Sequence, residues 1–457
     1  MLMLDPLDLP DWKTIRTEKT HHLDTFHAEY LIHPDACVKC ESPKIYKHGP
    51  KVTVFRDTPY RAKYTVISAK LTRYRCKDCG GVFVQPVTQI YDGMRITQRC
   101  VEHIQRRCLK DTFTRIADDV GCDDKTVRNI ATAYVEQLNK IYNPSLPEMI
   151  GIDETTIDGK LRFIITDIQN RKPIDMLDNR EKRFVSDYLY KHRNDPVKVV
   201  AMDMWKPYKQ VINAVFPNAS IVIDKFHVVR MANQAMDGVR ISLSKDRVKA
   251  IGRDWMQRKS LLRMRYRDLD EQGKYNVDMW LDNEPDIAIA HHLKEVFYLI
   301  YEMPTKEDAE ALLDEWLDII PNEMKKTSKD FKPLVTAVTN WRKEIMNFFD
   351  YPVTNGYTEA LNGVAKVINR SGRGYTFAML RARVLFNKYE LFEPPCFNVD
   401  PDITAEEFKI LEDSFVRCLS CFEPQTPEDH SVVCRRCLSR LHQDDLFLEA
   451  AKEYGLH

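Results

Sequence analysis

Short apolar runs in the middle of the chain alternate with helical patterns. The runs are Glu148–Asp153, Leu161–Ile168, Val197–Asp203 and Ser220–Asp224, and each ends at or near an acidic residue. Apolar runs of this length, bounded by polar residues, are typical of buried β-strands. Because helical segments lie between and after these runs, the pattern predicts an α/β core.

Helical stretches lie on both sides of this core. Residues 96–142 have a helical pattern, and so do residues 228–350, where Leu, Ile, Met and Trp recur at three- and four-residue spacing. This spacing puts apolar side chains on one face of a helix. The segment Asn143–Glu148 carries two prolines and is typical of a linker between the first stretch and the core.

The two ends of the chain differ from the middle. The runs Lys51–Phe55 and Tyr64–Tyr74 alternate and are rich in Val, Thr and Tyr, which predicts strands near the N-terminus. Near the C-terminus, the proline-rich segment Glu393–Asp402 marks a second boundary. The predicted domains are residues 1–92, 93–142, 149–392 with a helical insertion at about 228–350, and 403–457.

Composition places the chain among soluble globular proteins. It has 457 residues, of which 44% are hydrophobic and 30% charged, and equal numbers of basic and acidic residues. These values exclude collagen-like and wholly disordered proteins. No stretch approaches the roughly 18 apolar residues of a membrane span, and the acidic N-terminus lacks the basic segment of a secretory signal. We therefore predict a cytoplasmic protein that makes no membrane contact.

Eight of the twelve cysteines form four C-x-x-C pairs. The pairs are Cys37/Cys40, Cys76/Cys79, Cys418/Cys421 and Cys434/Cys437. Two such pairs supply the four thiolates of a tetrahedral zinc site with no open position for a substrate, so the spacing predicts two structural Zn²⁺ ions. The first two pairs are separated by 35 residues, which we expect to form a three-stranded insert. Redox dithiols and unligated core thiols are the alternatives.

Residues 113–130 have the pattern of a helix-turn-helix. We expect Gly121 to end the first helix in the left-handed conformation, and Asp123 or Asp124 to cap the second. The inward-facing residues would be Val127 and Ile130, and the residues exposed to DNA would be Lys125, Thr126, Arg128 and Asn129. A plain helical hairpin is the alternative.

Acidic residues follow three of the apolar runs, and another opens a later helix. Asp153, Asp203 and Asp224 end strand-like runs, and Glu359 begins a helical segment far downstream. A two-metal phosphoryl-transfer site requires carboxylates of this kind, because two Mg²⁺ ions need hard oxygen ligands that bridge them. A single such residue is more often a turn former or a helix cap, so only the combination points to catalysis.

Basic residues cluster in two places near these carboxylates. Ten Lys and Arg residues lie between Arg240 and Arg267, opposed by two acidic residues. Contacts to DNA phosphates would suit Arg247, Lys249, Arg253, Arg258, Lys259 and Arg263 of this stretch, and Arg370, Arg373, Arg381 and Arg383 after Glu359. A solvated helix face is the alternative. Trp205 and Trp255 are candidates for stacking on an unpaired base, although a core position is the commoner role of Trp.

A series of motifs extends over roughly residues 30–392. They are Cys37–Cys40 with His48-Gly49, Arg73–Gly80, the segment 113–130, Gly151–Glu154, Asp203–Trp205 with Tyr208, Phe216–His227, Thr354–Glu359 and Arg370–Tyr375. In this combination the chain resembles the bacterial insertion-sequence transposases of the ISL3 family. The most specific part is the run Phe216–His227 followed at a distance by Asn355–Glu359.

The resemblance implies an RNase H-like catalytic domain with a helical insertion and a DDE triad. Carried over by motif, the triad is Asp153, Asp203 and Glu359, with Asp224 and His227 as accessory site residues. Asp224 in place of Asp203 is the alternative second ligand. The triad would hold two Mg²⁺ or Mn²⁺ ions per active site. The C-terminal zinc ribbon is not part of the family pattern and would be an extra DNA- or partner-binding module.

Together these observations predict a DNA transposase that binds the ends of its insertion sequence, cleaves them and joins them to target DNA. Its partner would be double-stranded DNA in the bacterial nucleoid. Because two ends must be held together, we expect a homodimer or higher oligomer. One alternative is a non-catalytic DNA-binding regulator with the same zinc ribbon and helix-turn-helix, and another is a zinc-dependent structural protein. Retention of all three acidic positions and the basic stretch favour the enzyme.

Overall fold

The computed structural model describes residues 5–244, 259–326, 329–372 and 374–387, with two short strands at 416–417 and 424–425. The chain divides into two compact units, residues 1–389 and 390–457. In the second unit, β11 (Val416–Arg417) pairs antiparallel with β12 (Pro424–Gln425). Several predicted site residues lie outside the described part of the chain: Arg247, Lys249, Arg253, Trp255, Arg258, Arg373, Cys418, Cys421, Cys434 and Cys437.

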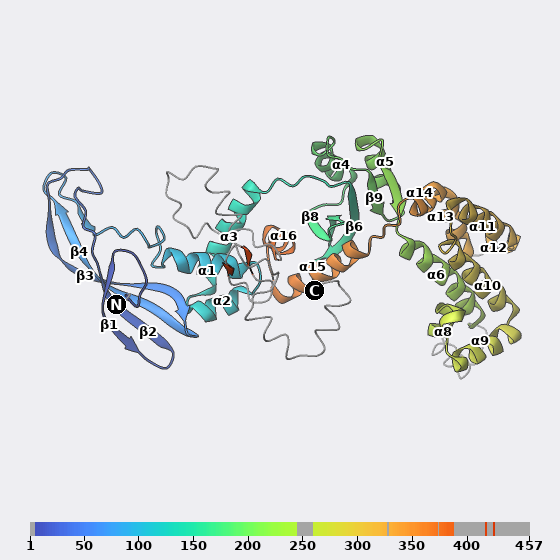
Figure 1. Ribbon diagram of the computed structural model, residues 1–457, viewed down its shortest axis with the longest axis horizontal. Coiled ribbons are helices and arrows are strands. Elements are labelled where there is room, and N and C mark those ends of the chain that lie inside the picture. Colours follow the sequence, from blue (N-terminus) through green and yellow to red (C-terminus); the bar gives the residue numbers. More distant parts are fainter. Residues whose placement is uncertain are drawn as a thin grey trace. The chain divides into compact units, whose positions relative to one another are not determined.

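The first unit begins with a five-stranded sheet of order β1-β2-β4-β3, with β5 paired to β4 (Figure 1). The strands are β1 (Trp12–Lys19), β2 (Leu23–Tyr30), β3 (Ile45–Tyr60), β4 (Lys63–Cys76) and β5 (Val82–Val84). β2 runs parallel to β4, and the other neighbours are antiparallel. Side chains along β2 are alternately buried and half-buried, so one face of the sheet packs a small apolar core.

One long hairpin joins the two N-terminal cysteine pairs, so our expectation of a three-stranded insert was wrong. β3 and β4 are 16 and 14 residues long and pair along almost their whole length. The hairpin turns at Arg61 and Ala62, which have φ angles of 54° and 58°. Neither is Gly, Asn or Asp, the residues that mark such turns in a sequence, and for this reason the pattern concealed a single tight turn.

Three helices follow the sheet: α1 (Gln98–Cys108), α2 (Phe113–Val120) and α3 (Asp124–Ile141). α2 ends at Gly121, which has a φ of 74°, and Asp123 caps α3 by accepting a hydrogen bond from the Thr126 backbone N–H at 2.8 Å. Both features agree with the sequence prediction. A Cβ at Gly121 would lie 2.7 Å from Arg56 and 2.8 Å from Tyr64, so the turn also needs glycine for its close approach to the sheet.

The second sheet contains the strands predicted for the α/β core and one that the pattern did not reveal. The strands are β6 (Met149–Ile157), β7 (Lys160–Asp167), β8 (Lys172–Leu177), β9 (Val199–Met202) and β10 (Ser220–Ile223), in the order β10-β9-β6-β7-β8. β6, β9 and β10 are parallel, whereas β7 is antiparallel to both neighbours. Helices α4 (Lys182–Lys191) and α5 (Lys206–Val215) lie between β8 and β10 in the sequence. β8 was missed because its six residues carry two charges.

The stretch after β10 is helical, as its apolar spacing predicted. Its described helices are α6 (Lys225–Ser244), α8 (Lys259–Arg263), the short 3₁₀ helix Tyr266–Asp268, α9 (Glu271–Asn283), α10 (Pro285–Ile300), α11 (Lys306–Ile319), α12 (Asn322–Lys326), α13 (Phe331–Asn340) and α14 (Arg342–Asp350). Their buried side chains form one apolar core with those of β6, β9 and β10. The insertion is therefore packed directly against the strands that carry the acidic residues.

The chain then returns to the sheet through α15 (Gly356–Gly372) and α16 (Phe377–Phe386), shown in orange in Figure 1. Leu361 of α15 and Leu380 of α16 pack against Ile164 of β7 and Met176 of β8. α15 also packs against β6. Among the described helices, none is long and apolar enough to cross a membrane.

Candidate active site and metal centre

Three acidic residues lie at neighbouring positions on the parallel strands. Asp153 is in β6, Asp203 follows β9 and Asp224 follows β10. β6 and β9 pair Gly151 with Ala201, and β9 and β10 pair Met202 with Ile223. Continued along the strands, this register brings the three acidic residues into one row across the sheet. The close spacing of adjacent strands, about 5 Å, accounts for their proximity.

α15 docks on β6 through an unusually close backbone approach. The Asn355 side-chain amide donates to the Ile152 carbonyl at 2.9 Å, and the Thr358 and Thr166 hydroxyls are 2.7 Å apart. A Cβ at Gly151 would lie 2.4 Å from Thr358 and 2.5 Å from Asn355. Only glycine leaves room for this contact, and the contact determines where the first turn of α15 lies.

Glu359 lies in that first turn, and Asn362 follows three residues later in the same helix. The Asn362 amide donates to Oδ2 of Asp153 at 2.6 Å, while Oδ1 of Asp153 accepts the Glu154 backbone N–H at 2.7 Å. Residues three apart share one face of a helix, so Glu359 and Asn362 face the same strand. Asn362 was not among the predicted site residues, although its spacing from Glu359 was a usable signal.

We predict that Gly151→Ala displaces α15 and reduces DNA cleavage by about 10²-fold, because a shift near 1 Å of a catalytic group has this effect. Overpacking should also destabilise the fold by roughly 1–3 kcal/mol. The measurements are single-turnover cleavage and thermal unfolding. Gly363→Ala is the matched control, because a Cβ there meets nothing within 4 Å. Equal cleavage by both variants would contradict the docking argument.

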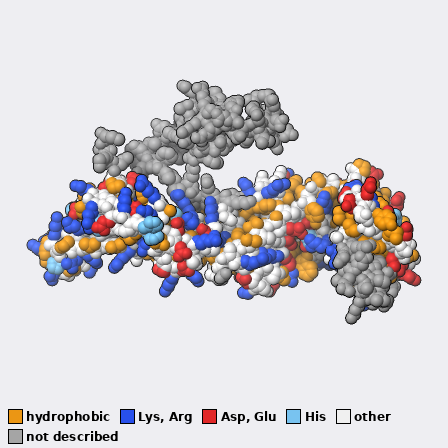
Figure 2. Space-filling view, turned by 90° about the horizontal axis from the view of Figure 1, so that it is seen from below, with side chains coloured by type: hydrophobic (Ala, Val, Ile, Leu, Met, Phe, Trp, Pro, Cys, Tyr) orange, Lys and Arg blue, Asp and Glu red, His pale blue; other side chains and the backbone are white. Residues whose placement is uncertain are grey.

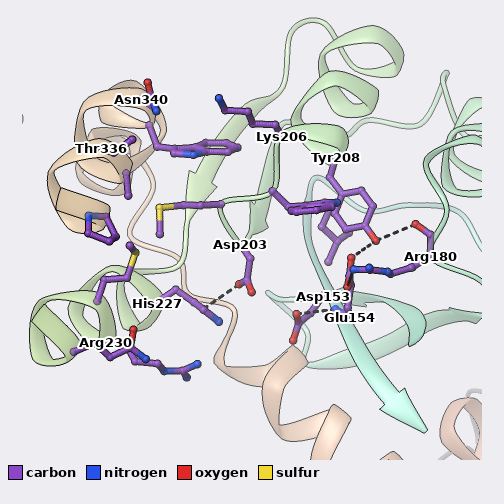
Figure 3. Close-up of a pocket in the computed structure, with 18 of the residues that line it drawn as sticks. Asp153, Glu154, Arg180, Asp203, Lys206, Tyr208, His227, Arg230, Thr336 and Asn340 are labelled. Carbon is purple, nitrogen blue, oxygen red and sulfur yellow. Dashed lines mark hydrogen bonds and ion pairs between the residues drawn. The ribbon is translucent and has the colours of Figure 1, made fainter. Parts of the chain in front are cut away.

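His227, in the first turn of α6, lies among the carboxylates (Figure 3). Its Nδ1 is 3.0 Å from Oδ1 of Asp203, 3.7 Å from Oδ2 of Asp224 and 3.8 Å from Oε1 of Glu359. An Arg230 guanidinium nitrogen is 3.7 Å from the same Glu359 oxygen. The structure therefore brings together all five predicted catalytic residues, from three strands and two helices.

The electrostatics of the site are those of crowded negative charge. Burial and the nearby charge of Asp203 raise the pKa of Asp153 to about 7. Interactions with the carboxylates of Asp203 and Asp224 raise the pKa of His227 to about 10, so the imidazole carries a positive charge near neutral pH. Oδ1 of Asp203 and Oδ2 of Asp224 are buried oxygens that accept no well-formed hydrogen bond from the described residues. Their nearest cationic neighbour is the His227 imidazole, at 3.0 and 3.7 Å, and oxygens that lack a well-formed hydrogen bond fit a site for divalent cations.

Asp224, His227 and Glu359 each place one ligand atom within 4.8 Å of the other two. Asp224 is fully buried, however, whereas Asp153, Asp203 and His227 line a pocket of about 1020 Å³. Its opposite wall includes residues of α13, and Figure 3 shows Thr336 and Asn340 there. The pocket therefore lies between the acidic strand ends and the helical insertion.

Glu154, Arg180 and Tyr208 form a further polar group in this pocket that sequence reasoning did not assign to the site. The Tyr208 hydroxyl donates to Glu154 at 2.6 Å, and an Arg180 guanidinium nitrogen lies 2.5 Å from the other Glu154 carboxylate oxygen. Burial and this hydrogen bond raise the pKa of Tyr208. The signal that pointed to them was weak: Glu154 follows Asp153 directly, and Tyr208 closes the motif that begins at Asp203.

The N-terminal cysteine pairs converge on one point. Sγ of Cys37 is 3.8 Å from Sγ of Cys79, and Sγ of Cys40 is 3.7 Å from Sγ of Cys76. All four sulfurs lie within 4.8 Å of one another. A zinc–sulfur distance of about 2.3 Å implies sulfur–sulfur distances of about 3.8 Å in a tetrahedron, so the four thiolates fit a structural zinc ion.

The predicted DNA-contacting residues of α3 lie largely in the open. Lys125, Arg128 and Asn129 are exposed, and Thr126 is partly exposed. The Thr126 hydroxyl donates to Asp123 at 2.8 Å, so it forms part of the helix cap. Val127 and Ile130 are buried, as predicted.

Other basic residues predicted to contact phosphates are engaged within the protein. Lys259 and Arg263 lie 3.2 and 2.9 Å from the nearly buried carboxylate of Asp237, which also binds Arg240 at 2.6 Å. Arg370 is exposed. In the described part of the insertion, Asp237 therefore engages three basic side chains, because a buried carboxylate requires compensating charge, and the group as a whole remains positively charged.

Arg381 and Arg383 of α16 are also engaged, in contacts with α2, α3, β8 and the adjoining loops. Arg381 binds Asp175 at 2.6 Å, and Arg383 donates to the Asp111 carbonyl while its guanidinium lies 4.1 Å from the Tyr375 ring centroid. These internal contacts argue against the phosphate contacts that we expected of the two residues. They link the helices before the linker to the second sheet.

Comparisons with known proteins agree with this geometry. A family model described as a transposase, of the ISL3 type of DDE enzymes, matches residues 150–384, more than half of the chain. A second, described as the zinc-finger of the transposases of IS204, IS1001, IS1096 and IS1165, matches residues 33–79. A curated relative, the transposase for insertion sequence element IS1001 from Bordetella parapertussis, is 22% identical over 365 residues, which cover 77% of this chain and 88% of that protein.

These matches define the class as transposases, enzymes that cleave DNA with the help of a divalent metal ion. Within that class, the chain belongs to the ISL3 family of DDE transposases. The first match contains the whole carboxylate site, and the second contains the four N-terminal zinc-site cysteines. The prediction of a transposase is therefore confirmed, structural zinc is supported at the N-terminal of the two predicted sites, and a non-catalytic regulator is not favoured.

Proposed function

We propose that β6–β10 and α15 form an RNase H-like core in which Asp153, Asp203 and Glu359 hold two Mg²⁺ or Mn²⁺ ions. The single observation that carries this proposal is the convergence of these carboxylates at one edge of the sheet. The strand order, with three parallel strands flanked by an antiparallel pair, supports it. So do the orphaned carboxylate oxygens and the raised pKa of Asp153, because bound cations would relieve this crowding of negative charge.

When bound, the ions activate the attacking oxygen and stabilise the leaving oxygen of the phosphodiester. The chain's own residues prepare this site. Asn362 fixes one oxygen of Asp153, which leaves the carboxylate in a single orientation. His227 holds Asp203 at 3.0 Å, and Arg230 lies beside Glu359, where a guanidinium is suited to a DNA phosphate.

Asp203, and not Asp224, is the second ligand in this proposal. Asp203 lines the pocket and is the charged group with the largest influence on Asp153, whereas Asp224 is fully buried and approaches His227 only at 3.7 Å. Asp224 then acts as a positioning residue for His227. Crystals soaked in Mn²⁺ test this assignment through anomalous scattering. Density bound by Asp153, Asp203 and Glu359 supports it, and density bound by Asp224 without Asp203 contradicts it.

We further propose that α2 and α3 form a helix-turn-helix that binds the ends of the insertion sequence as double-stranded DNA. The left-handed Gly121, the capped α3 and its exposed Lys125, Arg128 and Asn129 support this role. On the face shown in Figure 2, Lys and Arg side chains are frequent over the N-terminal sheet and α1–α3. Because cleavage of two ends must be coordinated, the active form would be a homodimer or higher oligomer.

We predict that Lys125→Ala and Arg128→Ala each weaken binding to an element-end duplex and lower the salt dependence of binding by about one phosphate contact. Lys140→Ala is the matched control, because Lys140 is an exposed cation near the C-terminal end of the same helix. The measurement is fluorescence anisotropy over a range of NaCl concentrations. An equal effect of all three variants would show that α3 does not approach DNA with its N-terminal end.

A further inference from the structure

Trp205 is an exposed aromatic residue beside the carboxylate site. It lies two residues after Asp203, at the start of α5, and 45% of its surface is exposed. It also lines the pocket of about 1020 Å³ that contains Asp153, Asp203 and His227. A large indole is normally well buried, so an open one in a pocket is suited to contact with a ligand.

The position of the indole is fixed by its surroundings. The Trp205 backbone N–H donates to the Asp203 carbonyl at 2.7 Å, so the ring moves with the strand end that carries the carboxylate. The Arg180 guanidinium lies 5.7 Å from the indole centroid and donates to Glu154, whose other carboxylate oxygen accepts a hydrogen bond from Tyr208. The Arg180 guanidinium therefore packs over one face of the indole in a cation–π contact, which helps to hold the ring in place.

The opposite wall of the pocket carries polar groups among apolar ones. Lys332, Thr336 and Asn340 of α13 line it, and Figure 3 shows Thr336 and Asn340 across the pocket from Asp203 and Tyr208. An amide and a hydroxyl can donate to and accept from the edge of a nucleobase. The pocket thus combines a flat apolar surface with groups that form hydrogen bonds, next to the predicted position of the scissile phosphate.

We propose that Trp205 is the stacking platform for one unpaired nucleobase, extruded from duplex DNA beside the scissile phosphate, whose edge faces Thr336 and Asn340. Enzymes that act within a duplex often extrude a nucleotide into a pocket of this kind, and aromatic stacking compensates for the lost base pair. The inference rests on the proposed function, because it requires DNA at the carboxylate site. The base comes either from the element end or from the target DNA.

The test is single-turnover cleavage of a duplex oligonucleotide that carries the element end, with Mn²⁺. Trp205→Ala should slow cleavage roughly 10- to 100-fold, the range expected for one stacked base, whereas Trp205→Phe should stay within a few-fold of the wild type. Tyr275→Ala is the control, since Tyr275 is an exposed aromatic residue of α9 outside the pocket. Unchanged zinc content and an unchanged thermal unfolding temperature would show that each variant is folded.

Substrates with one abasic site give the decisive measurement. An abasic site at the extruded position removes the need for unstacking, so it should restore cleavage by Trp205→Ala at that position alone. Abasic sites in the target strand, scored by strand transfer, distinguish target DNA from the element end as the source of the base. A Trp205→Ala defect that no abasic position relieves, or a Trp205→Phe defect of the same size, would overturn the inference.

Separate outcomes test the proposed function and the role of Trp205. A wild-type protein that cleaves no element end with Mn²⁺ would contradict the proposed function. A wild-type protein that cleaves, with Asp153→Asn inactive and Trp205→Ala fully active, would leave that function intact and overturn only the role of Trp205.

Discussion

Asp153→Asn is expected to abolish cleavage of element ends while DNA affinity stays unchanged. The asparagine has the same shape but cannot supply the negative charge that a divalent ion requires. Loss of several kcal/mol of transition-state stabilisation corresponds to about 10³-fold or more in rate. Asp153 contacts α15 and the strand backbone, not α3, so binding of the element end should not change.

The measurement is single-turnover cleavage with Mg²⁺ or Mn²⁺, beside anisotropy for DNA affinity. Asp158→Asn is the matched control: Asp158 lies in the turn after β6, with a φ of 52°, a conformation that Asn also adopts readily. Asp203→Asn and Glu359→Gln should resemble Asp153→Asn. If Asp153→Asn retains cleavage near the wild-type rate, the catalytic assignment falls, whatever the affinity for DNA.

Loss of zinc from the N-terminal site is expected to unfold the open end of the β3–β4 hairpin, where Ile45 pairs with Cys76. Cys37 and Cys76 are buried at that end, where few apolar side chains surround them. Structural zinc sites of this kind supply on the order of 10 kcal/mol of folding free energy, more than so small a core supplies. Cys37→Ser or Cys76→Ser should therefore expose the segment to proteolysis and release one zinc ion per chain.

Zinc content by mass spectrometry and limited proteolysis measure the effect. Cys122→Ser is the control, because Cys122 is a partly exposed thiol that lies outside the four-cysteine cluster. The second predicted zinc site, at Cys418, Cys421, Cys434 and Cys437, should retain its ion in the Cys37→Ser variant. Unchanged zinc content in that variant would mean that the N-terminal thiols do not bind zinc.

Local signals made much of the fold predictable. The cysteine spacing indicated the zinc site, and Gly121 with Asp123 indicated the end of α2 and the start of α3. Apolar runs predicted four of the five strands of the second sheet, and helical spacing predicted the insertion. Each of these features depends on residues close together in the sequence, where periodicity and turn chemistry act directly.

The candidate site was predictable in its residue types but not in its arrangement. Acidic residues at strand ends were visible in the sequence, and family resemblance related them to Glu359. The docking that brings Glu359 to them depends on Gly151, whose contact with Thr358 and Asn355 joins segments about 200 residues apart and leaves no signal in the local sequence pattern. Asn362 had no signal beyond its spacing from Glu359.

The sequence by itself determined the metal-binding residue types, the helical caps and the positions of most strands, because these depend on neighbouring residues. Only the tertiary structure decided which charges are engaged within the protein and which are available to DNA. Arg383 reaches a carbonyl 272 positions away, and Lys259 and Arg263 meet a buried Asp237. Contacts between distant segments leave no local period, so the sequence could not show that part of the basic stretch forms ion pairs within the protein.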